Sequence, residues 1–263
     1  MSSGPLLAWP LAPERPSLGV NEVHVWLACL RMTDAQIMHL RATLSPEERE
    51  RSVRYRFVRD QQRFIVARGL LRSILGSYLG TLPDQIRLSY NPHGKPELEP
   101  TEGPRTAGAR KEHIQFNVTH TEDVALYAVA RGRRVGIDVE RIRPGFADDR
   151  LSETFFAPRE AAALRSLPPN EQQKAFFACW TRKEAYVKAR GEGLVMPLDA
   201  FEVSLLPGDP ATLLTPDDPA EAARWSLCEL DLGPEYAATL AVEGQRWRLR
   251  LWRHPAAITK EVT

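Results

Sequence analysis

The order of the predicted secondary-structure elements repeats in the two halves of the chain, and this repeat constrains the fold more than any single motif. Apolar periodicity predicts, in the first half, a strand at 22–30, a short helix at 34–44, a helix opening at 45, a long helix at 60–79 and strands at 86–90, 114–119 and 124–130. The second half has a strand at 135–140, a short helix at 158–167, a long helix at 171–190 and strands near 201–205, 224–230, 236–242 and 247–252. We therefore expect an α+β protein of two similar halves joined near 131–134, with a ligand cleft between them.

The repeat also sets the expected domain boundaries. Residues 1–20 contain four prolines and no apolar period, which predicts a flexible N-terminal lead-in. The N-terminal subdomain is expected at 21–132 and the C-terminal subdomain at 133–263. Between the strands of the first half, a loop at 99–110 is rich in Pro, Gly and Thr, and its sequence indicates no role.

Composition excludes several classes of protein. The formal net charge of +1 over 263 residues gives no general attraction to nucleic acid or to an anionic membrane. The three cysteines are isolated, odd in number and without CxxC spacing, which argues against disulfides and against a zinc site. The N-terminus has no signal-peptide pattern, and no stretch approaches the roughly 20 apolar residues of a membrane span. We expect a cytoplasmic protein.

Two carboxylates lie side by side on the predicted strand at 135–140. The strand period of two places Asp138 and Glu140 on one face and the aliphatic side chains on the other. Mg²⁺ takes oxygen ligands, and a bound cation offsets the repulsion between adjacent carboxylates. A solvated polar strand face is the alternative for this pair taken alone.

A third carboxylate, Glu184, interrupts the apolar stripe of the long helix at 171–190. Because an isolated buried charge is costly, Glu184 must be paired or bound to a cation. The alternative to a cation is an ion pair with Lys188, which lies four residues further along the helix. Lys183 faces another direction and is expected to be a solvated flank of the helix.

Two short segments are suited to an anionic ligand. The turn at 91–96 is expected to hold Lys95 outward against Pro96, although a plain β-turn is the alternative. The next strand ends in Thr119 and His120, whose hydroxyl and imidazole can donate to phosphate oxygens. A histidine at a strand end can equally be structural.

The stretch 49–72 is rich in arginine. It carries eight arginines, including Arg51, Arg63 and Arg72, and acidic residues are interleaved with them. Most of these side chains are therefore expected on solvated helix faces. The interleaved acids also disfavour a nucleic-acid binder.

Taken together, and in this order, these segments resemble the Sfp-type 4′-phosphopantetheinyl transferases, which modify carrier proteins of fatty-acid, polyketide and nonribosomal peptide synthesis. The resemblance covers most of the chain from 45 to 201. Its most specific motifs are Val135-Gly-Ile-Asp-Val-Glu140 and, about 40 residues later, Trp180-Thr-Arg-Lys-Glu-Ala-Tyr-Val-Lys188, followed by Gly191-Glu-Gly-Leu194 and Pro197-Leu-Asp199. The family's upstream motifs are similar to Asn117-Val-Thr-His120, Gly94-Lys-Pro96 and the arginine-bearing helix at 57–72.

The resemblance implies a fold of two similar α/β subdomains related by a pseudo-twofold, each a small, mostly antiparallel sheet packed on a long helix. It implies a monomer with coenzyme A (CoA) as substrate, Mg²⁺ as cofactor and an acyl or peptidyl carrier protein as partner. A serine hydroxyl of the carrier attacks the β-phosphate of CoA. Phosphopantetheine stays on the serine, and adenosine 3′,5′-bisphosphate is released.

The resemblance also assigns roles to single residues. Asp138, Glu140 and Glu184 would hold Mg²⁺ against the pyrophosphate, and Lys188 would contact the same phosphates. The nucleotide end would be held by Arg51, Arg63, Lys95, Pro96, Thr119 and His120. The serine proton needs a base, for which Glu184 and a metal-bound water are the candidates. A low pKa would suit Glu184 as a ligand, and a raised pKa would suit it as a base.

Two other interpretations use the same residues. A Mg²⁺-dependent phosphohydrolase would employ the carboxylates with water as nucleophile, but the sequence has no obvious further acid cluster or second histidine beside them to orient that water. A carrier-binding module without activity is disfavoured by the complete set of acids together with Lys188. One departure from the family is Glu48, which stands where a basic residue often contacts the 3′-phosphate of CoA, with Arg51 at the neighbouring basic position.

Overall fold

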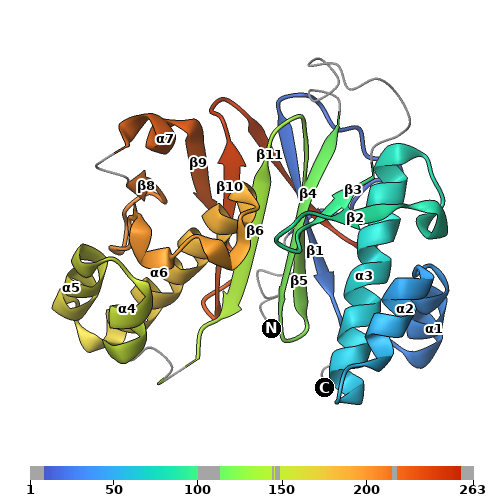
Figure 1. The fold of residues 1–263 in the computed structure, drawn as a ribbon, viewed down its shortest axis with the longest axis horizontal. Coiled ribbons are helices and arrows are strands. Elements are labelled where there is room, and N and C mark those ends of the chain that lie inside the picture. Colours follow the sequence, from blue (N-terminus) through green and yellow to red (C-terminus); the bar gives the residue numbers. More distant parts are fainter. Residues whose placement is uncertain (1–8, 100–112, 144, 146–148, 215–217, 256–263) are drawn as a thin grey trace.

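The computed structural model describes residues 9–99, 113–143, 145, 149–214 and 218–255, and the two expected halves stand side by side in it (Figure 1). In the N-terminal half, β1 (Glu22–Cys29), β5 (Val124–Arg131) and β4 (Ile114–Thr121) are neighbours in an antiparallel arrangement. The helices of this half are α1 (Asp34–Ala42), α2 (Pro46–Val53) and α3 (Val58–Leu79), followed by η2 (Pro83–Gln85), β2 (Leu88–Tyr90) and β3 (Pro96–Leu98). Side chains of α3 and of the sheet share one buried core.

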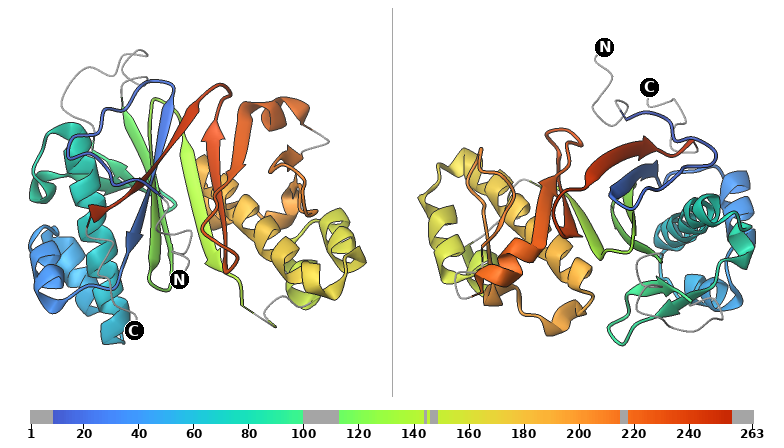
Figure 2. Two further views of the ribbon diagram at one scale, coloured as in Figure 1. Left: turned by 180° about the vertical axis from the view of Figure 1, so that it is seen from behind. Right: turned by 90° about the horizontal axis from the view of Figure 1, so that it is seen from above.

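The C-terminal half has the same plan. Its sheet is antiparallel, in the order β6 (Val135–Arg141), β10 (Tyr236–Glu243) and β9 (Trp225–Glu229). The other elements are α4 (Asp149–Phe155), α5 (Pro158–Ser166), α6 (Pro169–Arg190), η4 (Gly193–Val195), η5 (Leu198–Ala200), β7 (Glu202–Val203), β8 (Leu213–Leu214) and α7 (Pro219–Arg224). The long helix α6 lies against β6 and β10, as the view from above shows (Figure 2). The predicted fold class, a small, mostly antiparallel sheet on a long helix in each half, is confirmed.

The helix ends follow from local sequence. The long helices α3 and α6 are both 22 residues long, and each ends at a left-handed glycine, Gly80 with φ 64° and Gly191 with φ 75°. Glycine takes this conformation without the steric cost of a Cβ atom. The predicted capping box of α2 is present, since the side chains of Ser45 and Glu48 each accept a hydrogen bond from the other's backbone N–H. Within the described ranges, no helix has the length and apolarity needed to cross a membrane.

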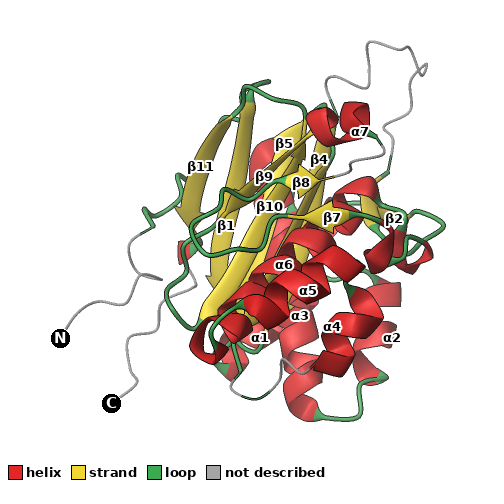
Figure 3. Ribbon diagram, turned by 90° about the vertical axis from the view of Figure 1, so that its left-hand side faces the viewer, coloured by secondary structure: helices red, strands yellow, loops and turns green. Residues whose placement is uncertain are grey.

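A shared apolar core joins the two halves. Alternate side chains of β1 and β5 pack with Val135, Ile137 and Val139 of β6 and with Leu240 of β10, and all of them are buried. Figure 3 shows the strands of both sheets lying next to one another. Because side chains alternate along a strand, the polar face of β6 is turned away from this core, toward α6.

One strand joins a different sheet from the one expected. The closing strand near 247–252, expected in the C-terminal half, is β11 (Arg248–Arg253), and it pairs in parallel with β1. The N-terminal sheet therefore has four strands, in the order β11-β1-β5-β4. Alternation indicates which side chains of a strand are buried, but it does not indicate which sheet the strand joins. The last strand of the C-terminal subdomain expected at 133–263 is thus part of the N-terminal sheet.

The lead-in expected at 1–20 is packed against the fold where the structure describes it. Trp9 is 5% exposed and Leu18 is 6% exposed, so both side chains belong to the buried cores. The prolines of this segment therefore do not prevent it from packing against the rest of the protein. Residues 1–8, and all but the first residue of the loop expected at 99–110, lie outside the described residues.

Candidate active site

Strand β6 and helix α6 approach each other closely at Gly136. A Cβ atom on this residue would overlap the backbone carbonyl of Ala185 and the backbone nitrogen of Ala189. Only glycine leaves room for this contact, so the polar face of β6 lies directly against the last turns of α6. Asp138, two residues further along β6, consequently meets Lys188 of α6.

Gly136→Ala is expected to destabilise the protein by about 3 kcal/mol. The added methyl group would meet helix backbone, which cannot move aside as a flexible side chain can. Urea unfolding measures the change in free energy. Gly19→Ala is the control, because its Cβ would meet only the side chain of Glu22. An equal loss of stability in the two variants would contradict the close approach of β6 and α6.

Asp138 is a buried carboxylate with one oxygen paired and the other unpaired. Lys188 Nζ lies 2.5 Å from Oδ1, and the Thr119 hydroxyl donates to the same oxygen at 3.1 Å. Oδ2 is buried and has no hydrogen-bond partner among the described residues. The alternative ion pair between Glu184 and Lys188 is not formed in the part of the chain that the structure describes, because Lys188 pairs with Asp138. A cation would satisfy the unpaired oxygen.

Glu140 and Glu184 complete an acidic group around Asp138. The Thr121 hydroxyl donates to Glu140 Oε2 at 3.3 Å. Burial raises the pKa of Glu140, and the negative charge of Asp138 raises it further. Burial also raises the pKa of Glu184; Lys188 opposes this rise and Asp138 adds to it. The negative charge of Asp138 therefore contributes to the raised pKa of both Glu140 and Glu184.

The chemistry of this group fits Mg²⁺. No group of three or more His, Cys, Asp or Glu side chains among the described residues is arranged to hold a metal by itself. Mg²⁺ does not require such a cage, since it binds through one or two carboxylates, several waters and substrate phosphates. The unpaired oxygen of Asp138 and the carboxylate of Glu140 are the two protein ligands that such a site would need.

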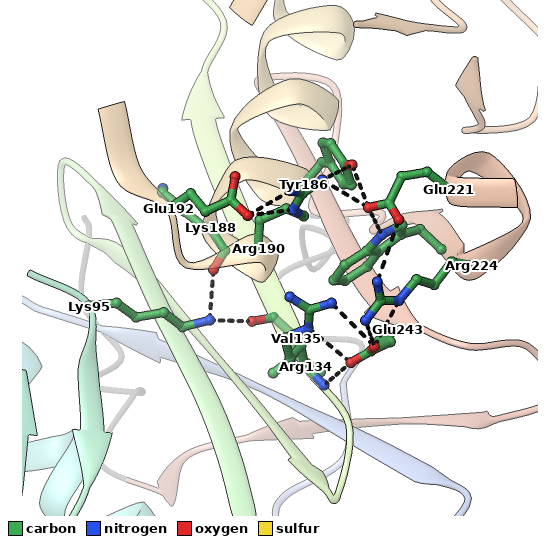
Figure 4. Close-up of polar contacts among 11 residues, drawn as sticks. Lys95, Arg134, Val135, Tyr186, Lys188, Arg190, Glu192, Glu221, Arg224 and Glu243 are labelled. Atoms are coloured by element: carbon green, nitrogen blue, oxygen red, sulfur yellow. Dashed lines mark hydrogen bonds and ion pairs between the residues drawn. The ribbon is translucent and has the colours of Figure 1, made fainter. Parts of the chain in front are cut away.

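Lys95 reaches across the boundary between the halves. Its Nζ donates to the carbonyl of Val135 at 3.1 Å and to the carbonyl of Lys188 at 2.7 Å (Figure 4). Asn91 shapes the turn, because its Oδ1 accepts from the backbone N–H of Lys95 and its Nδ2 donates to the carbonyl of Gly191. The ammonium that the sequence assigns to a phosphate thus holds the start of β6 against the end of α6.

The stability that depends on Lys95 is expected to change with pH. Burial lowers the pKa of Lys95 to about 8 in the folded protein, against about 10.4 in an unfolded chain. Between these values the unfolded chain binds more protons, so the folded state gains stability as the pH rises. Urea unfolding from about pH 7 to about pH 10 should show wild-type protein gaining stability relative to Lys95→Met. If the difference in free energy of unfolding between wild type and Lys95→Met does not change with pH, burial of the Lys95 ammonium is contradicted.

The predicted phosphate ligands of β4 and α3 have different surroundings. His120 follows Thr119 on β4, and its side chain is exposed. Desolvation by the surrounding protein lowers the pKa of His120, as do the charges of Lys188 and Arg63. Arg63 is bonded to Asp123, with Nε and Nη2 at 3.1 and 2.8 Å from Oδ1. Thr119 therefore contacts the acidic site directly, whereas Arg63 is held by Asp123 and interacts electrostatically with His120.

Arg51 contacts α3, and the nearby Glu48 has a structural role. Arg51 is exposed, and its guanidinium stacks over the ring of Phe64 at 5.4 Å. Glu48 is 5% exposed and pairs with Arg68 at 3.3 Å and Arg72 at 2.6 Å. Arg68 and Arg72 are therefore buried partners of Glu48 and do not belong to the solvated arginines expected in this stretch.

Lys183 is fully buried, which corrects the expectation of a solvated flank. Its Nζ pairs with Glu160 at 2.7 Å and donates to the carbonyls of Leu198 at 2.7 Å and Phe201 at 2.5 Å. Through these contacts Lys183, the residue before Glu184, attaches η5 to α6. The sequence carries no signal for the two carbonyl contacts, because every residue has a backbone carbonyl and such bonds require no particular residue type at the accepting positions.

A polar network fixes the last turns of α6 (Figure 4). Glu221 accepts hydrogen bonds from the Tyr186 hydroxyl at 2.9 Å, from Arg190 Nη1 at 2.9 Å and from Trp225 Nε1 at 2.8 Å. Hydrogen bonds from charged groups are stronger than those between neutral groups. The helix turn that carries Lys188 is therefore also held by contacts with α7 and β9.

A pocket of about 260 Å³ lies between the two halves, where the ligand cleft is expected. Lys95 lines it from the turn before β3 and Pro96 from the start of β3. Val118 lines it from β4, and Glu184 and Lys188 line it from α6. The charged side chains of α6 thus stand at the wall of a partly apolar pocket, which is typical of small-molecule sites.

Comparisons with known proteins show the family to which the chain belongs. A model of the 4′-phosphopantetheinyl transferase superfamily matches residues 134–241, and a model of the N-terminal part of a 4′-phosphopantetheinyl transferase matches residues 31–131. The chain belongs to the 4′-phosphopantetheinyl transferase family.

Individual relatives match over most of their length. The 4′-phosphopantetheinyl transferase HetI of Nostoc sp. is 41% identical over 246 residues, which cover 94% of this chain and 98% of that protein. The 4′-phosphopantetheinyl transferase psf-1 of Bacillus pumilus is 32% identical, over 70% of this chain and 74% of the relative. The 4′-phosphopantetheinyl transferase Sfp of Bacillus subtilis is 29% identical, over 66% of this chain and 72% of the relative.

Proposed function

We propose that this chain transfers 4′-phosphopantetheine from CoA to a serine hydroxyl of an acyl or peptidyl carrier protein, in a Mg²⁺-dependent reaction. The serine oxygen bonds to the β-phosphorus, the bond from that phosphorus to the bridging oxygen breaks, and adenosine 3′,5′-bisphosphate leaves. The observation that carries the proposal is the buried Asp138 with its unpaired oxygen, paired with Lys188, which together with Glu184 lines a pocket between the halves.

Asp138, Glu140 and Glu184 would hold the Mg²⁺. When bound, this ion neutralises charge on the pyrophosphate as the nucleotide leaves. Two hydroxyl groups of β4 hold two of these carboxylates in place, since Thr119 donates to Asp138 and Thr121 donates to Glu140. Most of the catalysis then comes from holding charges in fixed positions.

Glu184 and Lys188 supply the remaining chemistry in this proposal. Glu184 lines the pocket, and its raised pKa supports the role of general base for the serine proton. Lys188 lines the same pocket, where its ammonium can contact the phosphates. Because Nζ is paired with Asp138 in the structure, a lysine that binds the phosphates must exchange this partner for them.

The nucleotide end of CoA is proposed to lie along β4, α2, α3 and the start of β3 with the turn before it. The residues assigned to it are Arg51, Arg63, Lys95, Pro96, Thr119 and His120. Of these, Lys95 and Pro96 line the pocket between the halves. A monomer is supported because one chain supplies both walls of this pocket, and a cytoplasmic location stays a prediction.

The experiment that tests the proposal follows CoA by liquid chromatography, with and without an apo carrier protein. Transfer predicts that adenosine 3′,5′-bisphosphate forms only when the carrier is present, in an amount equal to the carrier modified, and that EDTA stops the reaction. Formation of the nucleotide from CoA without a carrier would favour the phosphohydrolase instead. No consumption of CoA with any of several acyl and peptidyl carriers would contradict the proposal.

A further inference from the structure

Two edge strands face each other where the halves meet. β4 ends the N-terminal sheet and β6 ends the C-terminal sheet, and the two strands are in contact without being paired in one sheet (Figure 1). An edge strand normally leaves backbone N–H and C=O groups that need partners. Here side chains of β4 supply some of these partners to β6.

Alternate residues of β4 form this set of cross-strand bonds. Asn117 Oδ1 accepts from the backbone N–H of Ile137 at 2.8 Å, and the Thr119 hydroxyl donates to Asp138. Because side chains alternate along a strand, the next residue on the same face is Thr121. Asn117, Thr119 and Thr121 are 5%, 7% and 5% exposed, so water does not compete strongly for these bonds.

Thr121 makes two contacts with β6. Its hydroxyl donates to Glu140 Oε2 at 3.3 Å and accepts from the backbone N–H of Arg141 at 3.4 Å. The second contact fixes the direction of the hydroxyl proton, since the oxygen that receives the Arg141 N–H must turn its own proton elsewhere. That direction is toward the carboxylate of Glu140.

We infer that Thr121 is a positioning residue, which orients the Glu140 carboxylate toward the cation from across the boundary between the halves. The inference rests on the proposed function, because it assigns Glu140 to the cation. Glu140 has several rotatable bonds, and the hydroxyl removes part of that freedom before a ligand arrives. The acidic pair of β6 is thus oriented by side chains of the other half, so the site depends on how the two halves are docked.

Mn²⁺ binding to the full-length protein, measured by electron paramagnetic resonance in the presence of CoA, tests this inference. Thr121→Val is expected to weaken Mn²⁺ binding about tenfold, the usual effect of removing a group that orients a metal ligand. Thr121→Ser keeps both hydrogen bonds and is expected to bind within about twofold of wild type. Circular dichroism checks folding, and Thr121→Ala replaces the valine variant if that variant does not fold.

Thr239→Val is the matched control. Thr239 is a buried threonine in the same sheet, and its hydroxyl pairs with the Thr181 hydroxyl at 3.1 Å and not with a carboxylate. Unchanged Mn²⁺ binding by Thr121→Val would overturn the inference, and the proposed function would stand if wild-type protein still modifies a carrier. An equal loss in Thr239→Val would also overturn it, because the effect would then be general loosening. Absence of Mn²⁺ binding by wild-type protein would overturn both the inference and the proposed metal site.

Discussion

Asp138→Asn is expected to lower the rate of phosphopantetheine transfer roughly 1,000-fold or more. Asparagine keeps the shape of the side chain but removes the negative charge that now pairs with Lys188 and that would hold the cation. Initial rates of holo-carrier formation at saturating Mg²⁺ measure the loss. Glu184→Gln is expected to have an effect of the same order, since it removes a ligand and the proposed base together.

Two controls show whether the effect of Asp138→Asn comes from the lost charge or from lost folding. Circular dichroism and urea unfolding show whether the variant keeps its structure. Asp209→Asn changes an exposed aspartate in the segment between β7 and β8 and is expected to keep wild-type activity. A rate for Asp138→Asn within about tenfold of wild type, in a folded variant, would show that the metal site is assigned to the wrong residues.

Lys188→Met is expected to change metal binding and transfer in opposite directions. Without CoA, Mg²⁺ should bind about tenfold more tightly than in wild type, because the ammonium 2.5 Å from Asp138 no longer competes for the carboxylate. Transfer should fall by roughly 100-fold, because the phosphates lose a positive charge. Isothermal titration with Mg²⁺, before and after addition of CoA, measures the first effect.

If Lys188 exchanges Asp138 for the phosphates of CoA, the binding of CoA and the binding of Mg²⁺ should be coupled. In wild type, CoA should strengthen Mg²⁺ binding, since its phosphates draw the lysine from Asp138, and this coupling should be smaller in Lys188→Met. Lys174→Met, on an exposed lysine of the same helix, is the control and should leave Mg²⁺ binding unchanged. Weaker Mg²⁺ binding by Lys188→Met than by wild type, in the absence of CoA, would contradict the proposed competition between Lys188 and Mg²⁺ for Asp138.

Periodicity predicts much of the fold and of the acidic site because both depend on short-range geometry. The strand period of two puts Asp138 and Glu140 on one face of β6, and helical spacing puts Glu184 and Lys188 on one face of α6. Capping chemistry likewise predicts the start of α2 from Ser45. These relations hold within one element, so no knowledge of its neighbours is needed.

The remaining features depend on contacts between elements that are distant in the sequence. Lys95 donates to backbone carbonyls of the other half, and Lys183 pairs with Glu160 beneath η5. Glu48 pairs with Arg72 inside the N-terminal half. Such partners follow from packing and leave no periodic pattern. For the same reason the pairing of β11 with β1 could not be predicted from the alternation within either strand.

The central claim is that the carboxylates of β6 and α6 form a site for phosphopantetheine transfer. The most direct test incubates the protein with CoA, Mg²⁺ and an apo carrier protein and then determines the intact mass of the carrier. The claim predicts that wild-type protein adds the mass of one phosphopantetheine to the carrier, that Asp138→Asn adds almost none, and that a carrier whose serine is replaced by alanine is not modified. No gain in mass on any of several carriers, or an equal gain with Asp138→Asn, would contradict it.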